Sequence, residues 1–135
     1  MLKLVIGLKG TGKTKTLIVE ANKAVERSHG AVICVEYGKK LTFDIKHQIR
    51  LIDCLDYDID NGQKLYGFIG GLLAGNYDIT DLFIDSALKI CKENISEFEN
   101  FIKHAAMIAE KNHINCYITA SVEAEKLSSD VLKYI

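Results

Sequence analysis

Short apolar runs along the chain alternate with longer segments in which apolar residues recur every three or four positions. The apolar runs fall at residues 2–6, 31–35, 49–55, 82–84 and 115–120. The runs are largely continuous, whereas a strand with one face exposed to solvent shows regularly alternating apolar and polar residues. Continuous runs are typical of strands buried on both faces of a parallel sheet. We therefore expect five strands in one mainly parallel sheet.

Segments with helical spacing lie between and after these runs. The expected helices cover residues 13–28, 41–47, 63–74, 96–111 and 123–135. Ser96 and Glu99 have the spacing of a capping box and predict the start of the fourth helix. Gly67, Gly70 and Gly71 weaken the third helix, and we expect them to allow close packing of that helix on the sheet.

The alternation of strands and helices predicts a three-layer α/β/α fold with a mainly parallel five-stranded sheet. The 135 residues fit one domain, with a core over 1–122 and a C-terminal helix over 123–135. The net charge of -1 gives no global attraction for nucleic acid, and no apolar run is long enough for a membrane span. The four cysteines are scattered without a C-x-x-C pair, which is typical of reduced core residues in a cytoplasmic protein.

One motif near the start of the chain points to phosphate binding. Residues 7–14, GLKGTGKT, match G-x-x-x-x-G-K-[ST] between an expected strand and an expected helix. Glycines let backbone N–H groups wrap a phosphate, and the helix start adds its positive dipole end. Lys13 would contact the β- and γ-phosphates in a catalytic role, and Thr14 would bind Mg²⁺. The candidate nucleotide-binding residues are Gly7, Lys9, Gly10, Thr11, Gly12, Lys13, Thr14 and Lys15.

Polar residues at the carboxyl ends of the other strands extend this site, because ligands of parallel sheets bind at that edge. Asp85 ends the stretch DLFID and could hold Mg²⁺ through a water, or simply cap the next turn. Glu36 follows AVICV and could act in catalysis by orienting the attacking water, or be an exposed glutamate at a turn. Thr119 and Ser121 are candidate γ-phosphate sensors, or a β-forming threonine and a loop serine.

The order of these parts resembles the RecA-like ATPase core of the P-loop NTPases. The matching stretches are GLKGTGKT, AVICV with Glu36, IRLIDCL, QKLYGFIGG, DLFIDSALKI with its Asp85-Ser86 pair, and CYITAS. The resemblance covers residues 1–122. It implies the strand order 3-2-4-5-1, in which the fifth strand separates the P-loop strand from the strand that ends at Asp85.

Members of that family continue with further strands beyond the P-loop strand, so the resemblance is to a minimal or truncated core. The first strand would then be an open edge, which natural proteins avoid. We expect the helix over 123–135 or a second subunit to cover this edge. The second subunit would be either another copy of the chain or a different protein.

These features predict a protein that binds ATP with Mg²⁺ and hydrolyses it slowly, as a switch or assembly factor. Neither Arg27 nor Arg50 is placed to act as a finger, so the charge of the transition state would be poorly neutralised. A small-molecule kinase is an alternative, although no arginine-rich lid is recognisable. A nucleotide-dependent interaction module without hydrolysis would have nearly the same sequence. Nucleic acid and membrane partners are not expected.

Overall fold

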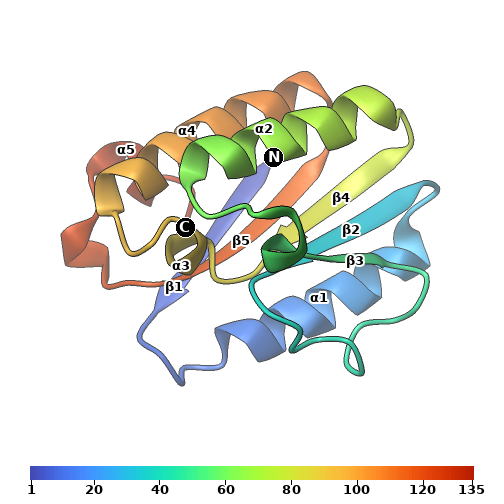
Figure 1. Ribbon diagram of the computed structural model, residues 1–135, viewed down its shortest axis with the longest axis horizontal. Helices are drawn as coiled ribbons and strands as arrows, with labels where there is room; N and C mark the ends of the chain where they lie inside the picture. The colour runs from blue at the N-terminus through green and yellow to red at the C-terminus, as the bar shows by residue number, and fades with distance from the viewer.

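Five parallel strands form one sheet through the middle of the molecule (Figure 1). The computed structural model describes residues 1–135. The strands are β1 (Leu2–Gly7), β2 (Ala31–Glu36), β3 (Arg50–Asp53), β4 (Ile79–Ile84) and β5 (Asn115–Ser121). They lie in the order β1-β5-β4-β2-β3, and every neighbouring pair is parallel. Counted from the β3 edge, the same order is β3-β2-β4-β5-β1. Each strand therefore has the neighbours given by the order 3-2-4-5-1.

Helices cover both faces of the sheet and give the expected three layers. The helix α1 (Lys13–Arg27) lies on one face, whereas α2 (Gly62–Gly75) and α4 (Ile95–Lys111) lie side by side on the other (Figure 1). The shorter elements are η1 (Cys54–Tyr57), α3 (Ala87–Ile90), η2 (Ala124–Lys126) and α5 (Ser129–Leu132). None of the helices combines the length and the apolar character that crossing a bilayer requires.

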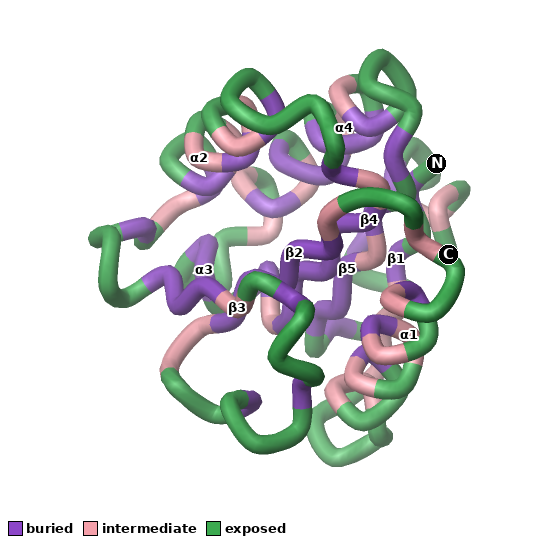
Figure 2. The backbone as a smooth tube through the Cα atoms, turned by 90° about the vertical axis from the view of Figure 1, so that its right-hand side faces the viewer, coloured by how far each residue is buried: buried purple, intermediate pink, exposed green.

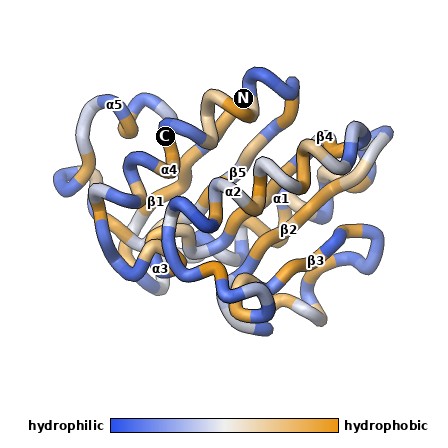
Figure 3. The backbone as a smooth tube through the Cα atoms, turned by 45° about the horizontal axis from the view of Figure 1, so that its top comes forward, coloured by the Kyte–Doolittle hydropathy of each residue, from blue (hydrophilic) through white to orange (hydrophobic).

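The sheet separates two apolar cores of unequal size. A cluster of 30 buried residues includes the inner faces of α2 and α4, and a cluster of nine includes the inner face of α1. Side chains of a strand alternate between the two, since Leu82 and Ile84 of β4 belong to the larger cluster and Phe83 to the smaller. The central strands are therefore covered on both sides and mostly apolar; Figure 2 marks their buried residues and Figure 3 their hydropathy.

The segment 41–47 forms turns, so the expected helix there is wrong. Leu41 and Ile45 are buried against α1 as a helix face would be, which explains the misleading spacing. The side-chain amide of Asn22 on α1 donates to the Asp44 carbonyl and accepts from the Lys46 N–H, both at 3.0 Å. A helix would need these backbone groups for its own hydrogen bonds, so this contact with α1 favours the turns.

Two further boundaries differ from those expected, for local reasons. The α4 helix begins at Ile95 and is capped by Asn94, whose side chain accepts from the Glu97 N–H at 3.0 Å. The expected capping box is wrong because Glu99 instead accepts hydrogen bonds from the backbone and hydroxyl of Ser128. The third strand ends early, at Asp53, because its carboxylate accepts from the Leu55 N–H and starts the η1 turn.

The glycines of α2 do not pack against the sheet. At Gly67, Gly70 and Gly71 an added Cβ would have no heavy atom within 4 Å, so the expected close packing is wrong. The helix turns another face to the core, formed mainly by Leu65, Ile69 and Leu73 at i, i+4 and i+8 spacing. These three glycines therefore lie outside the face of the helix that packs on the core.

The C-terminal segment covers part of the free edge of β1. It contains η2 and α5 separated by an extended stretch, so the single helix expected over 123–135 is wrong. Leu127 and Val131 anchor this segment in the larger core. The N–H of Leu4 in β1 donates to the Tyr134 carbonyl at 2.8 Å, on the side of the strand away from β5. The tail thus meets the edge as expected, although by a backbone contact rather than by a helix.

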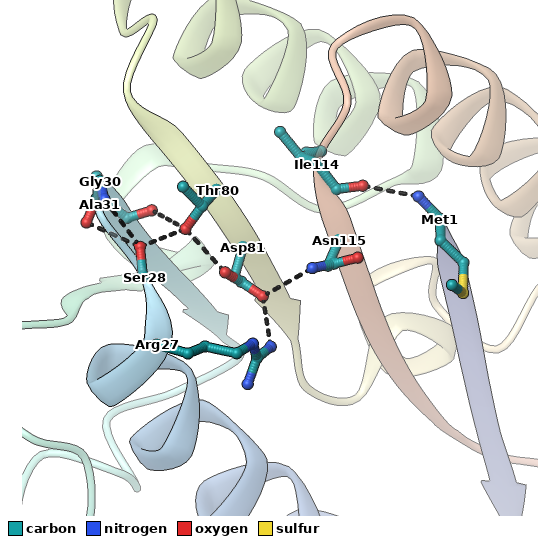
Figure 4. Close-up of polar contacts among 9 residues, drawn as sticks. All are labelled: Met1, Arg27, Ser28, Gly30, Ala31, Thr80, Asp81, Ile114 and Asn115. Carbon is teal, nitrogen blue, oxygen red and sulfur yellow. Dashed lines mark hydrogen bonds and ion pairs between the residues drawn. The ribbon is translucent and has the colours of Figure 1, made fainter.

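A polar cluster joins α1 to the sheet at the amino ends of the strands (Figure 4). The Asp81 carboxylate of β4 is buried and accepts from Arg27 at 2.8 Å, from the Thr80 hydroxyl at 2.8 Å and from Asn115 at 3.4 Å. The N-terminal ammonium of Met1 donates to the Ile114 carbonyl at 2.8 Å nearby. At this end of the sheet the charged groups are therefore paired with partners inside the protein.

Candidate functional site

The loop between β1 and α1 lies at the carboxyl edge of the sheet, beyond the tip of the β1 arrow in Figure 1. Gly10 and Gly12 have φ values of 86° and 87°, which other residues rarely adopt. At Gly7 an added Cβ would lie 2.8 Å from the Thr11 hydroxyl oxygen. The loop conformation therefore requires the glycines at the motif positions.

The ammonium of Lys13 lies over the loop. It donates to the Leu8 carbonyl at 2.9 Å and approaches the Thr11 hydroxyl at 3.5 Å. The Thr11 hydroxyl in turn donates to the same carbonyl at 2.7 Å. These bonds hold a cation beside the first turn of α1, where unpaired N–H groups also favour an anion.

Asp85 lies at the centre of a hydroxyl network at the end of β4. The Thr14 hydroxyl donates to its two carboxylate oxygens at 3.1 and 3.2 Å, so the motif threonine and this aspartate face each other. The buried Thr119 hydroxyl donates to Asp85 Oδ1 at 2.7 Å and accepts from the Ser86 N–H at 2.9 Å. Thr119 therefore fixes the position of the carboxylate.

These residues line a cavity of about 610 Å³. Of the residues expected from the sequence, those lining it are Lys9, Gly10, Gly12, Lys13, Thr14, Lys15, Asp85, Thr119 and Ser121. Gly7 and Thr11 shape the loop without lining the cavity. Five lysines and two carboxylates line it, a local excess of positive charge in a chain whose net charge is -1. Such a cavity attracts anions, because charges of one sign around a cleft reinforce each other.

Glu36 is the one expected catalytic residue that does not line the cavity. Glu36 is the last residue of β2, and its buried carboxylate accepts through Oε1 from the Lys40 N–H at 2.9 Å and from the Leu41 N–H at 3.0 Å. The side chain thus organises the turn that follows its own strand. Its separation from the cavity gives no support to a role in orienting water.

Several lining residues were missed by sequence reasoning. Lys40, Lys89, Ser86, Leu88 and Glu93 also line the cavity. Each follows β2 or β4, so a search for polar residues shortly after the strand ends could have found all but Leu88. The Lys89 and Lys92 ammonium groups each lie 5.4 Å from the centre of the Tyr37 ring, which joins the β2 and β4 ends of the site.

The cysteines supply no nucleophile to this site. All four are buried and none forms a disulfide. Burial raises the pKa of Cys54, Cys91 and Cys116 to about 12 each. Burial, and then the neighbouring Asp85 and Glu36 carboxylates, raise the pKa of the Cys34 thiol further. Because the thiolate is the reactive form, these side chains are inert at neutral pH.

No protein-family model matches the chain, and curated proteins give no significant match.

Proposed function

We propose that this chain is a P-loop protein with a RecA-like strand order that binds ATP with Mg²⁺ in the lysine-rich cavity. The observation that carries the proposal is the pairing of Thr14 with Asp85. A G-x-x-x-x-G-K-T loop brings its hydroxyl to 3.1 Å from the carboxylate of Asp85, which directly follows the buried strand β4. A chance match to the motif would have no reason to meet such a carboxylate.

The charge of the cavity favours a polyphosphate over a neutral ligand. The lysines come from three separate parts of the chain: the P-loop with the start of α1, the turn after β2, and α3. Cations placed around a cleft can contact several phosphate groups of one ligand at once. In this arrangement Lys13 would contact the phosphates nearest the loop, together with the N–H groups at the start of α1.

Thr14 and Asp85 fit a magnesium ion that is shared with phosphates. The chain has no group of three or more histidine, cysteine or acidic residues that could hold a metal alone. Mg²⁺ in nucleotide sites typically takes only one or two protein ligands and keeps waters and phosphate oxygens. Thr14 would supply its hydroxyl and Asp85 would hold a bound water, while the Thr119 hydroxyl keeps the carboxylate in place. Bound magnesium would neutralise phosphate charge.

Nucleotide titration calorimetry tests this proposal. Wild-type protein is expected to bind a non-hydrolysable ATP analogue with Mg²⁺, and Lys13→Ala to weaken binding by at least about 10-fold, since it removes a charge-assisted phosphate contact. Lys64→Ala is the matched control, because Lys64 is an exposed lysine of α2 paired with Asp60 and lies outside the cavity. Equal binding by all three proteins, or no binding by the wild type, contradicts the proposal.

Hydrolysis would be slow, in keeping with a switch or assembly factor. No arginine lines the cavity, and Glu36 lies outside it. The same placement of Glu36 favours the second candidate, an interaction module that binds ATP without turnover. Phosphate release measured over hours separates the two, because only the slow ATPase would release phosphate at a rate that Lys13→Ala abolishes.

A further inference from the structure

The turn after β2 carries two adjacent lysines that point to different places. Lys39 pairs with Asp53 at 3.1 Å and with Asp56 at 2.7 Å, outside the cavity. Lys40 is exposed, has no ion pair and lines the cavity. The turn therefore places one lysine in the protein's own ion pairs and directs the other to the ligand side.

The Glu36 carboxylate holds the turn after β2 through backbone hydrogen bonds. Its Oε1 accepts both the Lys40 and the Leu41 N–H groups. Gly38 has a φ of 89°, and its N–H donates to the Asp53 carboxylate at 2.8 Å, which holds the other side of the turn. Leu41 is buried in the smaller core. The backbone of Lys40 is thus held on both sides although its side chain is free.

The strand order gives Lys40 a definite place along the cavity. The P-loop follows β1, Asp85 follows β4, and Lys40 follows β2, which lies beyond β4 from β1. A phosphate chain that starts on the P-loop and extends past Asp85 would reach Lys40 last. Lys40 therefore lies on the side of the terminal phosphate.

We propose that Lys40 contacts the terminal phosphate of ATP and that Glu36 positions Lys40 for this contact. This inference rests on the proposed ATP site. Lys40 makes the protein prefer a nucleoside triphosphate over the diphosphate, and it supplies from the same chain a cation that such sites often receive from a partner. Glu36 acts through backbone hydrogen bonds, without contact to the nucleotide.

The affinity ratio between an ATP analogue and ADP tests the role of Lys40. Calorimetry with Mg²⁺ is expected to show that Lys40→Ala weakens the non-hydrolysable ATP analogue by about 10-fold and ADP by less than about 2-fold. Lys39→Ala is the matched control and should leave both affinities unchanged. Equal weakening of both nucleotides by Lys40→Ala, or no weakening, overturns the inference. Absence of binding by the wild type would instead defeat the ATP site itself.

Two substitutions of Glu36 separate positioning from water activation. Glu36→Gln keeps an oxygen that can accept both N–H groups and should preserve the ratio, whereas Glu36→Ala should lower it as Lys40→Ala does. The double variant Glu36→Ala with Lys40→Ala should have the same ratio of ATP-analogue to ADP affinity as Lys40→Ala alone. Circular dichroism verifies that each variant is folded. If Glu36→Ala unfolds, the affinity ratio and phosphate release of Glu36→Gln still test the positioning role. A Glu36→Gln protein that binds the ATP analogue normally but loses phosphate release would make Glu36 a catalytic residue and overturn its positioning role.

Discussion

At the scale of single residues, Asp85 shows how a buried carboxylate is held in place by hydroxyl groups. It accepts hydroxyl hydrogen bonds from Thr14, Ser86 and Thr119, which lie on different elements or turns. Only the bond from Thr119 is both short and buried, at 2.7 Å. Thr14 is bonded more loosely, so it can change partner at little cost while Thr119 keeps Asp85 in place.

Thr119→Val is expected to destabilise the fold and weaken magnesium-dependent binding. The substitution keeps the shape of the side chain but removes the donor to Asp85 and the acceptor of the Ser86 N–H, at a cost of about 1–3 kcal/mol. Urea unfolding measures this cost, with the exposed Thr42→Val as control and an expected change below about 0.5 kcal/mol. The affinity for the ATP analogue should fall more with Mg²⁺ present than with EDTA. Unchanged stability would show that the network adds nothing.

The sequence could indicate some of these residues and not others. The motif spacing and the end of the apolar run indicated Thr14 and Asp85, which lie within hydrogen-bonding distance. The direction of Glu36 could not be predicted, because it depends on the turn at Gly38 that brings the Lys40 N–H back to the carboxylate. Residues after a strand can be recognised from sequence, but the path of the turn decides which of them reach the cavity.

At the scale of elements, α1 is joined to the sheet mainly by its end and its inner face. Arg27 is the last residue of α1 and pairs with the buried Asp81 carboxylate of β4 (Figure 4). The inner face adds only small and medium side chains, Leu17, Ala21 and Ala24. The ion pair therefore fixes the C-terminal end of the helix that begins after the glycine-rich loop.

Arg27→Ala is expected to destabilise the protein by about 1–3 kcal/mol, because it removes a charged partner from a buried carboxylate. Chemical unfolding measures the loss. Glu26→Ala is the neighbouring control, since its pair with Lys46 is exposed to solvent and should contribute far less than the Arg27 pair. Equal costs for the two variants would mean that the burial of Asp81 does not matter.

The α2 helix should gain stability when its open glycines are replaced. Gly67→Ala and Gly71→Ala each place a methyl group in open space and are expected to add about 0.5–1 kcal/mol through helix propensity. Gly30→Ala is the opposite control, because its Cβ would clash with the Asp78 carbonyl oxygen. Thermal unfolding measures the change in stability of all three variants. A loss of stability at Gly67 or Gly71 would contradict the placement of these glycines.

At the scale of the whole molecule, the apolar pattern predicted the sheet far better than the connections. Continuous runs identify buried strands because both faces must be apolar, and the five strands occur where the runs are. The segment 41–47 and the tail were misread because contacts distant in sequence decide them, through Asn22 for the former and the Leu4 and Tyr134 backbone for the latter. Local spacing carries no information about such contacts.

The unequal cores should make the molecule open unevenly. The side of the sheet that holds α1 has nine clustered core residues, against 30 on the other side. Regions with fewer buried contacts open at lower free energy in native-state hydrogen exchange. Amides of α1 should therefore exchange faster than those of α4, and the ATP analogue should slow exchange in α1 most. The proposed ligand would then stabilise the α1 side of the sheet, which has the smaller core, so that binding lowers local opening there.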